Sequence, residues 1–228
     1  MILPYTQAMS RSVSVQSTFT LPTRAEIVSR LAASPPLEEL LTADDLERQA
    51  SIAQGDCKPA AVLILVVNHP GDPTIVFTQR TAHLADHAGQ ISFPGGRADE
   101  GDASRRHTAL REAEEEIGVA PERVEVLGQL PEYHTGTGYR VTPIVGWAEP
   151  PLRFSPDPHE VADVFEVPLA FLLDEGNHRY ESAFFKGRMR KFWSMPYGER
   201  FIWGATAGMI VTFHRILIPK PAVRKDFR

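Results

Sequence analysis

The sequence contains a single cysteine, Cys57, in 228 residues. One cysteine excludes an intrachain disulfide framework and a thiolate metal cluster, and it fits a reducing compartment. No apolar run reaches the length that crosses a membrane. The opening stretch, MILPYTQAMSRSVSVQS, lacks the charged segment and apolar segment of a secretory signal. We therefore expect a cytoplasmic protein without a membrane partner.

An excess of basic residues is also missing. The chain has 24 Lys and Arg against 29 Asp and Glu, which gives a formal net charge of -5. Because this balance provides no general attraction for polyanions, nucleic acid is not an expected partner. An anionic substrate has to be held by a few local cations. Hydrophobic residues make up 43% of the chain, enough for one domain with a sizeable core.

Three segments of different character follow one another along the chain. Residues 1–20 are polar without a period and are expected to form a mobile leader. Residues 21–58 predict a helical extension, which Thr23 and Glu26 open as a capping box. Residues 59–220 are the predicted main domain.

The main domain combines many strand patterns with few helices. It opens on the β-branched run 60–68, which is typical of a central strand buried on both faces. TIVFTQR is the expected hairpin partner, further strand patterns follow, and a helix from Ala205 to about Ile216 closes the domain. Together they predict an α+β fold, a mixed sheet flanked by helices in an α-β-α sandwich.

One helix has an unusual composition. Ala109, Ala113 and Ile117 recur every four residues and predict a helix that begins after Asp102, its expected N-cap. Gly118 is the expected end. The last turns of this helix carry four glutamates in the stretch REAEEEIGV.

Glu112, Glu115 and Glu116 fall on one side of that helix, whereas Glu114 points elsewhere. Like charges at this spacing repel, and they also oppose the helix dipole near the C-terminus. The ordinary explanation is a solvated acidic face beside Arg111. Two features favour a metal site. The preceding glycines of FPGGR let backbone approach a ligand closely, and clustered hard oxygen ligands suit Mg²⁺ or Mn²⁺ bridging substrate phosphates.

The stretch resembles the Nudix box, in which Gly, five residues, Glu and seven residues precede Arg-Glu-hydrophobic-x-Glu-Glu-x-Gly-hydrophobic. REAEEEIGV fits the second half at every specified position. In the first half, fourteen residues separate Gly96 from Arg111 where the pattern has thirteen. Ala103 stands at the expected Glu, and Asp102 comes just before it. The resemblance implies the Nudix form of the sandwich, with a catalytic loop and helix.

The longer loop resembles that of the coenzyme A pyrophosphatases, whose box has the form FPGGxxDxxDxxxxxTALREAxEEIG. FPGGRADEGDASRRHTALREAEEEIG matches this form. Upstream, TQRTAHLADHAG keeps most of the subfamily pattern T-x-R-S-x-x-L-R-x-H-x-G, with Ala85 in place of its second Arg. The resemblance covers about Ala60 to Thr206. It implies hydrolysis of coenzyme A or its derivatives to adenosine 3',5'-bisphosphate and a 4'-phosphopantetheine product.

Roles for single residues follow from the resemblance and from charge. Glu112 and Glu116 are the expected principal metal ligands for Mg²⁺ or Mn²⁺. Glu115 is either a third ligand or the base that activates water. Arg111 is expected to orient a glutamate by ion pairing. Glu160, in the loop PDPHEV, is a candidate additional carboxylate, with turn capping as the alternative.

Four residues are candidates for contact with substrate. Arg80, at the end of a predicted strand, is the first candidate for a phosphate contact, and a surface salt bridge is the equally good alternative. The others are His87, Gly95 and Gly96.

Two functional alternatives stay open. The first is the same chemistry on ADP-ribose or another nucleoside diphosphate derivative, because the helix serves any pyrophosphate. The second is a non-catalytic Nudix module that senses a nucleotide, although a sensor has no need of the unfavourable carboxylate cluster. The resemblance also implies a homodimer. The aromatic residues near the C-terminus are expected in the core or that interface, with stacking on an adenine as the less favoured alternative: Phe184, Phe185, Phe192, Trp193 and Trp203.

Overall fold

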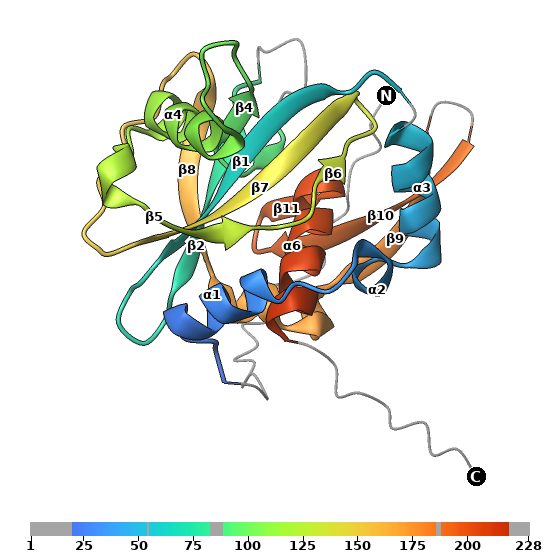
Figure 1. Ribbon diagram of the computed structural model, residues 1–228, viewed down its shortest axis with the longest axis horizontal. Coiled ribbons are helices and arrows are strands. Elements are labelled where there is room, and N and C mark those ends of the chain that lie inside the picture. Colours follow the sequence, from blue (N-terminus) through green and yellow to red (C-terminus); the bar gives the residue numbers. More distant parts are fainter. Residues whose placement is uncertain (1–19, 54, 83–88, 186–187, 219–228) are drawn as a thin grey trace.

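The computed structural model describes residues 20–53, 55–82, 89–185 and 188–218 (Figure 1). The expected leader therefore lies outside the described residues, apart from Thr20. Within these ranges, no helix is long and apolar enough to cross a membrane.

The central sheet is mixed, as predicted. Strand β1 (Lys58–Val67) runs parallel to β7 (Tyr139–Ala148) over its full length. β5 (Glu125–Gln129) is antiparallel to β7 on the far side, where β6 (Tyr133–His134) also pairs. β2 (Thr74–Arg80) is antiparallel to both β1 and β8 (Val161–Pro168).

A fork between β1 and β2 shapes the site. These two strands pair only where Val66 and Val67 meet Ile75 and Thr74. The chain that follows β2 fills the rest of the fork, because β3 (Ile91–Ser92) pairs with β2 and β4 (Gly95–Arg97) pairs with β1. The two glycines of the FPGG motif thus lie beside the first half of β1, next to the Glu112 and Glu116 side chains of the later turns of the carboxylate helix.

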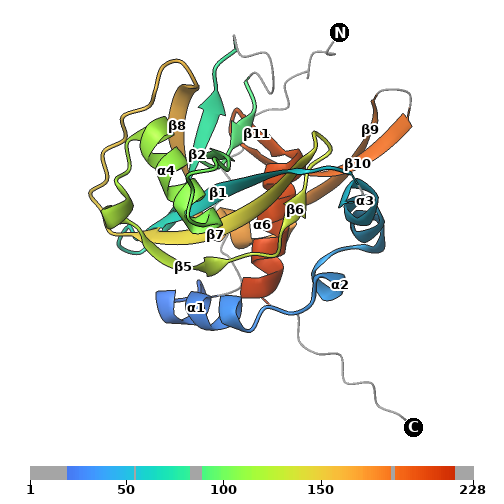
Figure 2. The ribbon, with the colours of Figure 1, turned by 45° about the horizontal axis from the view of Figure 1, so that its top comes forward.

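Helices cover both faces of the sheet, which confirms the layered α-β-α architecture (Figures 1 and 2). Side chains alternate along β1, as the strand period requires. Ala61, Leu63 and Leu65 pack with α4 (Arg105–Ile117) in one core. Ile64 and Val66 belong to the other core, which contains α6 (Gly204–Leu217), α1 (Arg24–Ala32) and α5 (Leu169–Leu173).

A second, three-stranded sheet lies beside α6. Its antiparallel strands are β9 (Arg179–Phe185), β10 (Arg188–Tyr197) and β11 (Arg200–Trp203). The strand patterns of the sequence predicted strands in this region, but they did not predict that these strands form a separate sheet. Phe184 and Trp203 are exposed and so do not belong to the core, whereas a place in a dimer interface stays a prediction for them.

The N-terminal helices pack on the sheets. Thr23 and Glu26 form the predicted capping box of α1. After α2 (Leu37–Leu40), helix α3 (Ala43–Ala53) is held by Gln49, whose side chain accepts from the His134 N–H at 2.6 Å and donates to its carbonyl at 3.1 Å. Two short 3₁₀ turns, Pro121–Arg123 and Glu175–Asn177, complete the described elements.

Candidate active site

Helix α4 carries the carboxylates and begins at Arg105, later than expected. Ser104 is its N-cap and accepts a hydrogen bond from the His107 N–H at 3.2 Å. The prediction of Asp102 as N-cap was wrong, because its carboxylate is engaged by Arg111 instead. The predicted end is confirmed: Gly118 has a φ of 71° and its N–H donates to the Glu114 carbonyl.

Asp102 is the buried anchor of the site. Its side chain is 2% exposed and accepts from Arg111 twice, Nε to Oδ1 at 3.0 Å and Nη2 to Oδ2 at 3.1 Å. The Thr108 hydroxyl and the Asp99 N–H also donate to it, at 2.9 Å and 3.0 Å. The Arg111 guanidinium above all holds the pKa of Asp102 well below its usual range. Arg111 thereby gains a fixed orientation.

Arg111 connects this anchor to the exposed end of the site. Its Nη2 lies 2.9 Å from Oε1 of Glu112, and its Nη1 lies 2.8 Å from Oε2 of Glu115. Nη2 also donates to the Arg97 carbonyl at 3.1 Å. Glu112 is mostly buried, whereas the Glu115 side chain is 60% exposed.

Gly96 shapes the position of Glu112. A Cβ atom on Gly96 would lie 2.7 Å from Oε1 of Glu112 and closer still to the other two carboxyl atoms. Real Cβ atoms do not approach so closely, so only glycine leaves this carboxylate its position. The paired glycines were predicted for close approach to a ligand. The described contact is with a carboxylate of the chain itself.

Glu116 is the buried carboxylate. The Gly95 N–H donates to its Oε2 at 2.9 Å, and Nη1 of Arg80 lies 3.7 Å from its Oε1. Burial raises the pKa of Glu116 to about 7, and the charges of Glu112 and Glu160 add to this effect. The Nε atom of Arg80 is buried and has no hydrogen-bond partner among the described residues.

Glu160 approaches from the loop before β8. It is exposed, and its charge contributes to raising the pKa of both Glu112 and Glu116. Its carbonyl accepts from the Thr81 N–H at 3.0 Å, which ties the loop to the end of β2. The turn itself is capped by Asp157, whose carboxylate accepts from the His159 N–H at 2.9 Å.

The donor set fits a divalent cation in its chemistry. Burial raises the pKa of Glu112, and Glu115 and Glu160 contribute to the same shift. Carboxylates that repel one another are stabilised in their charged form when a hard cation binds between them. As they stand, no three His, Cys, Asp or Glu side chains within the described ranges are gathered to hold a metal ion. Glu115 in particular accepts from Arg111.

The structure brings most of the predicted residues together. Glu112, Glu116, Arg80, Gly95 and Gly96 meet beside the first half of β1, and Glu160 lies within electrostatic reach. His87 lies outside the described residues.

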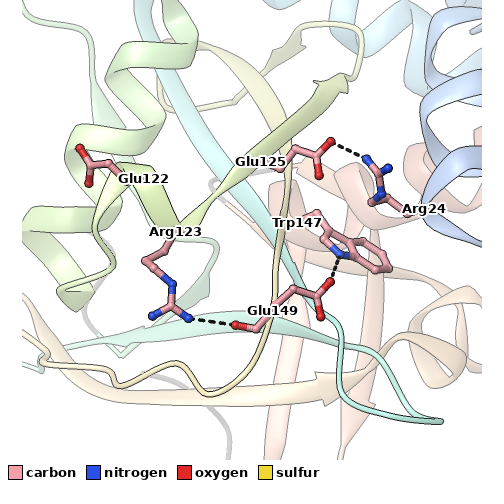
Figure 3. A pocket seen from close by; sticks show the side chains of 6 residues that line it. All are labelled: Arg24, Glu122, Arg123, Glu125, Trp147 and Glu149. Carbon is pink, nitrogen blue, oxygen red and sulfur yellow. Dashed lines mark hydrogen bonds and ion pairs between the residues drawn. The ribbon is translucent and has the colours of Figure 1, made fainter.

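A hollow of about 430 Å³ lies at the other end of β7 (Figure 3). Most of its charged side chains have partners within the protein. Arg24 pairs with Glu125, and the Trp147 indole N–H donates to Glu149 at 2.8 Å. Arg123 donates to the backbone carbonyls of Glu149 and Pro151. None of the predicted site residues lines this hollow.

Comparison with known proteins decides the family. The family model of the NUDIX domain matches residues 58–185, more than half of the chain. The chain belongs to the Nudix family. The uncharacterized Nudix hydrolase NudL of Escherichia coli strain K12 is 46% identical over 153 residues, which are 67% of this chain and 79% of that protein. This Nudix chain is therefore a hydrolase of pyrophosphate bonds, a class that uses divalent metal ions.

Solved structures of Nudix proteins resemble the chain at lower identity. A MutT/nudix family protein from Enterococcus faecalis matches with a TM-score of 0.47 and 15% identity, covering 85% of this chain and 73% of that one. The NUDIX domain of Shewanella oneidensis NrtR, complexed with ADP ribose, matches with a TM-score of 0.41 and 24% identity, covering 58% and 86%. Likenesses of this size do not identify a ligand.

The sequence pattern missed the anchoring role of Asp102. A signal was present, because Asp102 comes one residue before the position where the Nudix box has its first glutamate. The one-residue-longer loop carries the carboxylate to Arg111 all the same.

Proposed function

We propose that this Nudix hydrolase cleaves the pyrophosphate of coenzyme A or its derivatives and releases adenosine 3',5'-bisphosphate and a 4'-phosphopantetheine product. The observation that carries the chemistry is the position of the Glu112 and Glu116 carboxylates against Gly96 and Gly95, with Nη1 of Arg80 3.7 Å from Oε1 of Glu116. The choice of coenzyme A is supported by the match of the loop and helix to the subfamily form, including the extra loop residue.

Glu112 and Glu116 are the proposed ligands of Mg²⁺ or Mn²⁺, with Glu115 or Glu160 as a further oxygen donor. The ion, when bound, neutralises pyrophosphate charge and makes water easier to ionise. The side chains of this chain supply the rest. Asp102 holds Arg111, and Arg111 holds Glu112 and Glu115 in fixed positions.

Hydrolysis requires a water oxygen to form a bond with one phosphorus while the bridging P–O bond breaks. The departing phosphate keeps the electron pair of that bond. Where Glu115 does not bind the ion, it is the proposed base, because an exposed carboxylate can reach solvent and accept the proton from water. Arg80 is the proposed contact to a non-bridging oxygen, since its guanidinium has an unpartnered Nε and lies beside the carboxylates.

One assay tests the substrate. The protein is incubated with Mg²⁺ or Mn²⁺ and, separately, with coenzyme A, ADP-ribose, NADH and dinucleoside polyphosphates, and the products are resolved. We expect coenzyme A to give the two named products. Turnover of ADP-ribose with coenzyme A untouched would reject the substrate proposal. If no compound is turned over, the catalytic proposal fails and a nucleotide-sensing module is favoured.

A further inference from the structure

A cavity of about 600 Å³ lies where the two sheets meet, at the ends of β2, β3 and β11. The Thr206 hydroxyl, at the start of α6, donates to the Ile91 carbonyl at 3.1 Å and fixes this junction. Six side chains that line the cavity are Gln79, Gln90, Glu199, Arg200, Phe201 and Trp203.

The cavity wall and the proposed phosphate contact share one piece of backbone. The Arg80 N–H donates to the Gln90 carbonyl at 3.0 Å, and the Gly89 N–H donates to the Arg80 carbonyl at 3.2 Å. Gln79 directly precedes Arg80, and the pairing of β2 with β8 is irregular between them. Neighbouring side chains of a strand point to opposite faces. Gln79 lines the cavity and Arg80 faces Glu116, so the cavity and the carboxylates lie on two sides of the end of β2.

Two aromatic side chains are exposed on this wall. Phe201 is 42% exposed and Trp203 is 40% exposed, and they lie on the same side of β11 because they are two residues apart. Trp203 also packs edge-on against Phe192, with ring centroids 5.6 Å apart. That contact orients the indole and leaves part of its surface uncovered. Exposed aromatic faces of this kind suit the stacking of a planar base.

The remaining lining favours a neutral, hydrogen-bonding ligand. Arg200 donates to the Gln79 amide oxygen and pairs with Asp163, and its guanidinium lies 4.4 Å from the centre of the Phe165 ring. Its charge is thus offset by a carboxylate of the protein. Glu199 adds a carboxylate to the lining, and Gln79, whose amide oxygen accepts from Arg200, keeps an amide N–H that can donate. This lining does not suit a second phosphate and does suit the edge of a heteroaromatic ring.

We propose that the cavity binds the nucleobase of the substrate, with the base stacked on Trp203 and Phe201. The proposal rests on the proposed function, because it takes the substrate to be a nucleoside diphosphate derivative whose phosphates lie near Arg80. In coenzyme A and in ADP-ribose that base is adenine. The cavity is then the part of the site that selects the base, whereas the helix carboxylates act on any pyrophosphate.

Binding is tested without hydrolysis, in the full chain. The protein has three tryptophans, so its indole N–H signals in a nitrogen–proton correlation spectrum can be followed one by one, and Trp203→Phe assigns the signal of Trp203. Adenosine and ribose 5-phosphate are titrated separately. We expect adenosine to move the Trp203 signal in a saturable way and ribose 5-phosphate to leave it in place. Trp147, which lines the other hollow, reports binding there (Figure 3).

Three variants make the test specific. Trp203→Ala is expected to weaken adenosine binding about tenfold, the size of one lost base–aromatic stack. Trp203→Phe keeps a ring and should lose less than about threefold. Phe184→Ala removes an aromatic that is 71% exposed on β9, outside the cavity, and should bind adenosine as the wild type does.

The outcomes separate the two proposals. An unmoved Trp203 signal, movement of Trp147 alone, or unchanged adenosine binding in Trp203→Ala overturns the base site. If coenzyme A is cleaved with the same KM by Trp203→Ala and the wild type, the base site also fails while the proposed function stands. If adenosine moves Trp203 but no pyrophosphate is hydrolysed, the base site stands and the proposed function fails.

Discussion

Asp102 and Arg111 form a two-point ion pair on a carboxylate that is almost completely buried, with N–O distances of 3.0 Å and 3.1 Å. The same guanidinium lies within 3 Å of Glu112 and Glu115. One arginine, itself fixed by the buried Asp102, therefore fixes the positions of two carboxylates of the site.

Replacing the anchor tests this transmission. Asp102→Asn keeps the shape but removes the charge that Arg111 faces, so we expect a loss of about 2–4 kcal/mol in the free energy of unfolding. Activity should fall at least about tenfold, because Glu112 and Glu115 lose their fixed partner. Denaturant unfolding and steady-state rates at saturating Mg²⁺ measure the two effects.

Asp99 provides the matched control. Its Oδ2 lies 3.8 Å from Arg111, but its side chain is 73% exposed. Asp99→Asn should therefore change stability by less than about 1 kcal/mol. Equal losses of unfolding free energy in both variants would mean that the buried pair stabilises the protein no more than the exposed pair does.

Gly96→Ala tests the fit between the loop and Glu112. The added Cβ atom would overlap the Glu112 carboxylate. The backbone of Gly96 does not have a positive φ, so alanine adds no backbone strain and the variant tests the overlap alone. We expect the carboxylate to move and kcat to fall at least about tenfold, since small displacements in a site cost this much. Gly101→Ala, where nothing lies within 4 Å of the added atom, should keep full activity. Similar kcat values for both variants would contradict the proposed fit.

Much of this site was predictable from local pattern. The period of Ala109, Ala113 and Ile117 predicted the buried stripe of α4, because side-chain burial on a helix follows a fixed repeat. Gly118 predicted the end of the helix, because glycine adopts the left-handed conformation that ends helices. The mixed sheet followed in the same way from the order of the strand patterns. The competition between the helix N-terminus and Arg111 for the Asp102 carboxylate was not predictable. Asp102 has the properties of an N-cap, but Arg111 comes within reach only when the longer loop folds back.

The fork between β1 and β2 was likewise hidden in the sequence. It depends on which strands pair, and the short stretches 91–92 and 95–97 carry no signal of their two different partners. For the same reason the cavity beside Trp203 could not be foreseen, because it forms where a second sheet meets the first.

Glu116→Gln separates function from stability. Burial disfavours the charge of Glu116 in the metal-free protein, so a neutral isostere is expected to raise the free energy of unfolding by about 1–3 kcal/mol. Activity should fall at least about a hundredfold if Glu116 holds the metal. Added Mg²⁺ should raise the melting temperature of the wild type and have a much smaller effect on the variant. Glu114→Gln, at an exposed position, is the control. An unchanged rate in Glu116→Gln at saturating metal would contradict the ligand role.

A pH dependence of stability is expected far from the carboxylates, at His178. Its Nε2 atom lies 2.8 Å from the Leu172 carbonyl, and burial lowers the pKa of His178 below the ordinary value of 6.5. The ring of His214 lies edge-on, with the two ring centroids 4.9 Å apart, and it lowers the pKa of His178 further. Glu175 and Asp174 raise that pKa and so oppose the effect. Because the unfolded chain takes up the proton first as pH falls, stability is present above 6.5 and is lost below it. His178→Gln keeps a donor for the carbonyl and removes the titration. Unfolding in denaturant at pH 7.5 and 5.5 should therefore show a larger loss on acidification for the wild type than for the variant. Equal losses would show that folding does not lower the pKa of His178.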